Sequence, residues 1–109
     1  MEIKFKDKKI RDLCERQATA QRKLGVACAR KLRARLSDLE AADQVSNLLA
    51  GNPHPLKSDR AGQFALYLAG GRRLVFAPAH DPCPIHEDGG IDWSRVTIIC
   101  IEYIGNYHG

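Results

Sequence analysis

The sequence predicts an α+β fold in which two or three helices pack on one face of a small, mainly antiparallel β-sheet. Residues 7 to 50 follow a helical period of apolar side chains, whereas residues 63 to 77 alternate apolar with polar or small side chains as strands do. A short alternating segment precedes the helices, and an apolar, β-branched segment closes the chain. The order strand, helices, then three strands favours helices gathered on one face of the sheet.

The first two elements follow from local patterns. Residues 2 to 6 alternate Ile3 and Phe5 with charged residues, which indicates a short edge strand. Residues 7 to 16 have apolar side chains at three- and four-residue spacing, which predicts a first helix.

Residues 18 to 35 form the predicted main helix, with apolar and basic side chains on opposite sides. The apolar positions are Leu24, Cys28, Leu32 and, further along, Leu39; the basic positions are Arg22, Lys23, Arg30 and Arg33. Ser37 and Glu40 fit a capping box, so we expect the helical stretch to bend there, restart and run to about Ala50. Gly51-Asn52-Pro53 then ends it.

After the helices the period changes to that of strands. Residues 63 to 68 and 72 to 77 are expected to pair as a hairpin, because Gly70-Gly71 between them accepts a tight turn. Residues 78 to 95 contain three prolines and two adjacent glycines, which predicts a loop that Trp93 anchors on the core. Residues 96 to 104 are almost continuously apolar, which predicts a central strand buried on both faces.

Length and composition indicate one folded domain, residues 1 to 109, with the loop at 78 to 95 inserted into it. The 44% apolar and 28% charged content is typical of a folded, soluble protein. No apolar run approaches the ~20 residues that span a bilayer, and residues 1 to 6 lack the apolar stretch of a secretion signal. We therefore expect a cytoplasmic protein whose four widely spaced cysteines are free thiols.

Positive charge is concentrated near the N-terminus. Twelve Lys and Arg residues lie within residues 1 to 35, against four Asp and Glu residues. Such a surplus favours an anionic partner, most often nucleic acid, although a solvated helix face is an alternative interpretation. The candidates for contacts with RNA are Arg22, Lys23, Arg30, Arg33, Arg60 and Arg72.

Much of the polar chemistry lies in residues 54 to 60, residues 71 to 76 and the last three residues. Cleaving RNA without a metal ion requires a base for the 2′-OH, cations for the phosphate and an acid for the departing 5′ oxygen. Histidine suits both proton transfers, and Arg and Lys suit the phosphate. The candidate proton carriers are His54 and His108, the candidate phosphate ligands are Lys57 and Arg73, and Tyr107 is a candidate for stacking on a base or positioning the nucleophile.

The same segments resemble the HigB branch of the RelE/ParE toxin superfamily over nearly the whole chain outside the 78–95 loop. The resemblance rests on Leu56-Lys57-x-Asp59-Arg60-x-Gly62-x-Phe64, on Arg73-Leu74-Val75-Phe76, and on the terminal Tyr107-His108. It implies a RelE-like fold and an mRNA endonuclease that acts on the ribosome without a cofactor and is neutralised by a HigA-like helix-turn-helix antitoxin. It also implies that His54, Lys57, Arg73, Tyr107 and His108 form the active site.

Three positions depart from the family pattern. Asn106 stands where relatives often have an aspartate, and Asn cannot stabilise an imidazolium by charge. Tyr67 stands where relatives often have an arginine, so the phosphate site is expected to be one cation short. Arg72 replaces a usual aromatic residue beside Arg73, and strand alternation requires the two arginines to face different ways.

Several alternatives remain open at this point. His54 between two prolines is also a typical turn residue, and exposed Lys and Arg often form weak surface ion pairs. We expect the Asp59–Arg60 pair to bridge its loop to the sheet. His80, Cys83 and His86 offer a zinc site, although their spacing fits no common motif. The alternatives to a nuclease are a ParE-like non-catalytic inhibitor of gyrase and a degenerate relative that mainly binds an antitoxin.

Overall fold

A computed structural model describes residues 1–106 of the chain. The helices are α1 (Lys8–Glu15), α2 (Gln17–Leu24) and α3 (Val26–Ala41), with short 3-10 helices η1 (Val45–Asn47), η2 (Ser58–Arg60) and η3 (Trp93–Arg95). The strands are β1 (Glu2–Phe5), β2 (His54–Pro55), β3 (Phe64–Tyr67), β4 (Arg73–Pro78) and β5 (Ile98–Gly105). No helix of this described part is long and apolar enough to cross a bilayer.

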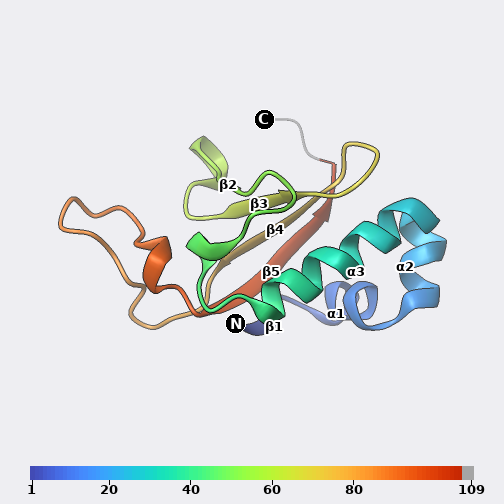
Figure 1. The fold of residues 1–109 in the computed structure, drawn as a ribbon, viewed down its shortest axis with the longest axis horizontal. Helices are drawn as coiled ribbons and strands as arrows, with labels where there is room; N and C mark the ends of the chain where they lie inside the picture. Colours follow the sequence, from blue (N-terminus) through green and yellow to red (C-terminus); the bar gives the residue numbers. More distant parts are fainter. Residues whose placement is uncertain (107–109) are drawn as a thin grey trace.

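The strands form one sheet in the order β1-β5-β4-β3-β2. β1 is an edge strand parallel to β5, and the other three pairings are antiparallel. The helices lie together along one side of the sheet, and the segment after β4 projects from the end of the molecule opposite α2 (Figure 1). The α+β fold with helices on one face of a mainly antiparallel sheet is therefore confirmed.

The core lies between α3 and the sheet. Leu32 and Leu39 of α3 are 1% and 0% exposed and belong to the central apolar cluster. The sheet contributes Leu66, Leu74, Phe76, Ile99 and Ile101 to the same cluster. Burying each such side chain stabilises the fold by about 1.5–3 kcal/mol. This layer therefore holds the helices on one face of the sheet, and the opposite face carries no α-helix of the described chain.

The predicted main helix is wrong at two points. Gly25 separates α2 from α3 with φ +86°, a backbone conformation incompatible with a continuous helix. The apolar spacing continues across this break, which is why periodicity did not reveal it. At Ser37 the helix does not restart: α3 runs through to Ala41, and only the three residues of η1 are helical before residue 50.

β5 also differs from its prediction. Ile99 and Ile101 are fully buried, whereas Cys100 and Tyr103 are partly exposed, so the strand is buried mainly on the helix side. An aromatic residue is thus available on the other side of the sheet.

Residues 78 to 95 form an ordered loop. Ile85 and Ile91 pair across it, and the Trp93 ring packs on Phe64 with 4.8 Å between centroids, as expected for the anchor. Asp92 accepts hydrogen bonds from the hydroxyl of Ser94 and from the side chain of Arg95. The Ser94 hydroxyl contributes most, and Arg95 next, to holding the pKa of the Asp92 carboxyl below its ordinary value.

Candidate functional site

Three of the candidate residues can be placed by the register of the sheet. Residues opposite one another on neighbouring strands share a face, and so do residues two apart on one strand. Tyr67 lies opposite Arg73, and His54 lies opposite Ala65, two residues before Tyr67. His54, Tyr67 and Arg73 therefore occupy one face, away from the helix-side core, which we call the open face.

Tyr67 lies between the other two side chains. The Arg73 guanidinium carbon is 4.7 Å from the centroid of the Tyr67 ring, and the His54 ring centroid is 5.7 Å from it. Tyr67 is 36% exposed, so this row is accessible from solvent. The sheet thus brings His54 and Arg73, which are 19 positions apart in the sequence, onto one aromatic side chain.

The His54 ring has a defined orientation. Its Nδ1 lies 2.7 Å from the carbonyl oxygen of Asn52, and a carbonyl can only accept, so Nδ1 carries the hydrogen. In the neutral ring, Nε2 is then the unprotonated nitrogen. Asn52 holds this carbonyl from a left-handed backbone conformation, φ +49°, which Asn adopts more readily than most residues. The arrangement suits a base that accepts a proton at Nε2.

A second arginine–tyrosine pair lies on the open face. Tyr103 of β5 is opposite Val75, which is two residues from Arg73 on β4. The Arg60 guanidinium carbon lies 4.9 Å from the centroid of the Tyr103 ring, and Arg60 also donates to Gln63. Arg60 therefore connects its loop to strand β5, as expected for the Arg60 part of the bridging Asp59–Arg60 pair.

The open face has a buried floor. Ala65 and Val75 point to this side, yet both are 0% exposed. The register places them beside Tyr67, Arg73 and Tyr103, so these larger side chains stand on an apolar base.

Lys57 and Arg72, two other predicted contacts for RNA, are not part of the row of His54, Tyr67 and Arg73. Lys57 is exposed at the start of η2, in the segment that also carries Arg60. Arg72 donates to the Leu24 carbonyl at the end of α2, over 3.4 Å, while Arg73 lies on Tyr67. The two adjacent arginines therefore face different ways, as alternation predicts, and Arg72 lies apart from the row.

Tyr107 and His108, both predicted catalytic residues, lie outside the described residues. The last described residue is Asn106, whose carbonyl accepts a hydrogen bond from the Tyr103 hydroxyl. Gly105, just before it, is opposite Arg73. The described chain therefore ends beside the row.

Tyr67 and Tyr103 were not among the candidate site residues. The sequence contained a signal for Tyr67, because this residue alternates with Phe64 and Leu66 along β3. Phe64 and Leu66 face the core, so Tyr67 faces the other side of the sheet. Tyr103 lies in a nearly unbroken apolar segment, where no pattern separates the two faces.

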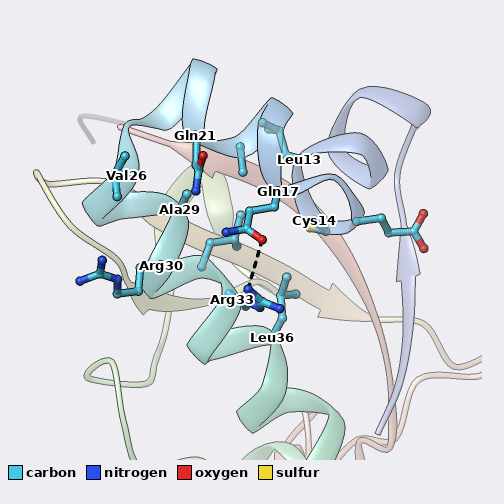
Figure 2. A pocket seen from close by; sticks show the side chains of 12 residues that line it. Leu13, Cys14, Gln17, Gln21, Val26, Ala29, Arg30, Arg33 and Leu36 are labelled. Atoms are coloured by element: carbon cyan, nitrogen blue, oxygen red, sulfur yellow. Dashed lines mark hydrogen bonds between the residues drawn. The ribbon is translucent and has the colours of Figure 1, made fainter.

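The basic helix residues Arg22, Lys23, Arg30 and Arg33 are all exposed, on the opposite side of the sheet from the row. Arg30 and Arg33 line a hollow of about 310 Å³ between α1, α2 and α3, where Arg33 donates to Gln17 (Figure 2). Burial, and then the charge of Glu15, raise the pKa of the Cys14 thiol in this hollow to about 12. No histidine is among the residues that line this hollow, so it lacks the proton carriers expected for RNA cleavage.

The zinc alternative is not supported. The His80 Nε2 accepts hydrogen bonds from the backbone N–H groups of Thr97 and Ile98, at 2.9 and 3.1 Å. Within residues 1–106, no three His, Cys, Asp or Glu side chains come together as a metal site. His80 instead ties the loop to the start of β5.

Comparisons with known proteins identify the fold. No protein-family model matches the sequence, and no curated protein matches it either. Among solved structures, a YoeB/ParE toxin from Agrobacterium tumefaciens is 14% identical with a TM-score of 0.62, over 99% of this chain and 100% of that one. The YoeB–YefM complex and the YoeB dimer from Staphylococcus aureus are 17% and 18% identical with TM-scores of 0.57 and 0.56, each over 100% of this chain and 98% of the other. The chain therefore has the fold of YoeB/ParE-type toxins.

Proposed function

We propose that this protein is the toxin of a toxin–antitoxin pair, of the HigB type in the RelE/ParE superfamily. Its proposed activity is a metal-independent endoribonuclease that cleaves mRNA on the translating ribosome, in the cytoplasm. The observation that carries this proposal is the contact of both His54 and Arg73 with Tyr67 on the open face. Cleavage of a phosphodiester needs a group that transfers protons and a cation that binds the phosphate. His54 and Arg73 supply these two groups beside the same tyrosine ring.

The proposed reaction uses the 2′-OH of the RNA as the nucleophile. The unprotonated Nε2 of His54 accepts the 2′-OH proton while the 2′ oxygen forms a bond to phosphorus. Arg73 and Lys57 stabilise the extra negative charge on the phosphate oxygens. The bond from phosphorus to the 5′ oxygen then breaks, and His108 donates the proton that this oxygen needs. The products are a 2′,3′-cyclic phosphate and a free 5′-OH.

The alternation of the two arginines supports the assignment of Arg73. Arg72 donates to the Leu24 carbonyl at the end of α2. Arg73 donates to the Gly71 carbonyl and lies beside the ring that His54 also contacts. The exposed arginines of α2 and α3 are proposed to contact rRNA phosphates, which supplies affinity without sequence information.

Primer extension on a reporter mRNA in a purified translation system tests the activity. We expect new 5′ ends within the translated frame with the wild type, and at least a hundredfold fewer with Arg73→Ala or His54→Ala. Intact mRNA at a stoichiometric dose of a folded wild-type protein would remove the nuclease proposal.

An antitoxin partner is also proposed, of the HigA-like helix-turn-helix type. One structural neighbour is a YoeB–YefM complex, and the basic helix side of this chain would attract an acidic antitoxin segment. Co-expression with a neighbouring reading frame, followed by co-purification and rescue of growth, tests this partner.

The ParE-like alternative has one specific observation in its favour, since the neighbour from Agrobacterium tumefaciens is described as a YoeB/ParE toxin. A ParE-like inhibitor of gyrase needs no catalytic histidine. Growth arrest that persists after both His54→Ala and His108→Ala would favour it over the nuclease. Harmless overexpression of the wild type would instead favour the degenerate relative, for which the departure at Asn106 argues.

A further inference from the structure

Charge is divided between the two ends of the molecule. Residues 78 to 95 carry four Asp or Glu residues and one Arg, a formal charge of −3, whereas the whole chain is +4. This loop projects from the end opposite α2, and the exposed basic residues of α2 and α3 lie toward the other end (Figure 1). Because the longest extent of the molecule is 44 Å, the tip of the acidic loop does not reach these residues within one copy.

The loop presents its side chains on a closed hairpin, residues 84–92, which we call the arm. Ile85 pairs with Ile91 across it, and backbone hydrogen bonds close the hairpin on both sides of this pair. Ile85 is nevertheless 52% exposed, and Glu87 and Asp88 are exposed at the tip. Within the described chain neither of these two carboxylates forms an ion pair. The arm therefore holds an apolar side chain beside two negative charges in a preorganised arrangement, which lowers the entropic cost of binding.

The hollow between α1, α2 and α3 has the complementary chemistry. Its floor consists of alanine and leucine side chains from the three helices, and Val26 at its edge is 58% exposed. Arg30 and Arg33 follow one another along α3 at its rim (Figure 2). Glu15 also lines the hollow, but Arg11 pairs with this carboxylate at 3.7 Å. The hollow thus offers an apolar floor beside two positive charges.

We propose that the arm of one copy docks into the hollow of a second copy, so that each of two antiparallel copies receives the other's arm. Ile85 then lies on the apolar floor, and Glu87 and Asp88 face Arg30 and Arg33. Because arm and hollow lie at opposite ends, a two-fold axis fills both hollows at once and leaves no arm for a third copy. Each contact is small, so the pair is weak and forms at high protein concentration.

Pairing goes beyond the proposed function and has one consequence that rests on it. Arg30 and Arg33 are among the cations proposed to contact rRNA phosphates, and a docked arm covers them. Paired copies therefore bind ribosomes less readily than single copies do. Dilution shifts the equilibrium toward the single copy by mass action.

Sedimentation equilibrium of the full chain, without RNA, tests the pairing. We expect a monomer–dimer equilibrium whose dissociation constant rises with salt and rises at least about fivefold in Ile85→Ala. One double variant, Glu87→Lys with Asp88→Lys, reverses the charge of the arm, and another, Arg30→Glu with Arg33→Glu, reverses that of the hollow. Each alone should lose self-association at least about tenfold. Mixing the two should restore association, because each arm then meets a hollow of opposite charge.

The matched control is Lys8→Glu with Lys9→Glu, which changes the net charge as the hollow variant does, at exposed positions that do not line the hollow. It should self-associate as the wild type does, and should associate with the reversed-arm variant no better than the wild type does. Circular dichroism checks the folding of each variant.

Two results would overturn the pairing. Wild type that is monomeric at every concentration leaves the hollow to another acidic partner, and a dimer that neither Ile85→Ala nor the charge reversals weaken uses another surface. Neither result bears on the nuclease, because association is measured without RNA or ribosomes. Intact mRNA in the cleavage assay would likewise leave the pairing standing.

Discussion

Replacing Arg73 by alanine should reduce mRNA cleavage far more than replacing Arg72. Both changes remove one arginine from neighbouring positions, so the net charge and the long-range attraction to RNA fall equally. Only Arg73 lies on the open face, where its guanidinium is 4.7 Å from the Tyr67 centroid. Losing one positioned donor to a developing oxyanion costs about 10²–10³ in rate. We therefore expect about that loss for Arg73→Ala, and less than about threefold for Arg72→Ala.

The assay is the rate of mRNA cleavage on translating ribosomes, with urea denaturation of each variant to separate folding from activity. Arg72→Ala loses a 3.4 Å hydrogen bond to Leu24, so its cost should appear as about 1 kcal/mol of stability rather than as lost rate. Arg73→Lys should recover part of the activity, because a lysine supplies a point charge without the bidentate geometry. Equal losses of rate in Arg72→Ala and Arg73→Ala would refute the assignment of the site to the open face.

Three further predictions concern the fold. Gly25→Ala should lower the free energy of unfolding by about 1–3 kcal/mol. The loss should come from backbone strain alone, because the new Cβ meets nothing within 4 Å. Urea denaturation measures the loss, and a loss no larger than that of Ala27→Gly would contradict this prediction. The Met1 ammonium donates to three carbonyls at the end of α3. Acetylating this ammonium should therefore lower the midpoint of thermal unfolding. An unchanged midpoint would show that the ammonium does not stabilise the end of α3. The pKa of Asp92 is lowered in the folded protein, so its carboxylate stabilises the 78–95 loop above the ordinary carboxyl range and this contribution is lost as pH falls through the lowered pKa. After correction for the intrinsic slowing of amide exchange at low pH, the hydrogen-exchange protection of the loop should therefore fall on acidification in the wild type more than in Asp92→Asn.

The sequence predicted the layers of the fold because periodicity reports which side of an element is buried. Leu32 and Leu39 were expected on the apolar side of the main helix, and both are fully buried. The break at Gly25 was missed for the same reason: apolar spacing continues across it, and a single glycine is tolerated inside many helices. The capping-box pattern at Ser37 failed because α3 continues through it, with Leu39 two residues later in the core.

The candidate site was only partly predictable. Residue chemistry pointed to His54 and Arg73, but their shared contact with Tyr67 depends on the strand register, which the sequence does not encode locally. Tyr67 was noted only as a missing arginine. Tyr103 was hidden in a segment interpreted as buried on both faces, whereas in the structure it is partly exposed on the open face.

Cross-linking of mRNA to the protein on the ribosome tests most directly whether the open face holds the message. Reporter mRNA that contains 4-thiouridine is irradiated on translating ribosomes with the His54→Ala protein, and the cross-linked peptides are identified by mass spectrometry. We expect cross-links at peptides that contain Tyr67, Arg73 or Tyr103. Cross-links to mRNA confined to α1, α2 and α3 would contradict a message-binding site on the open face.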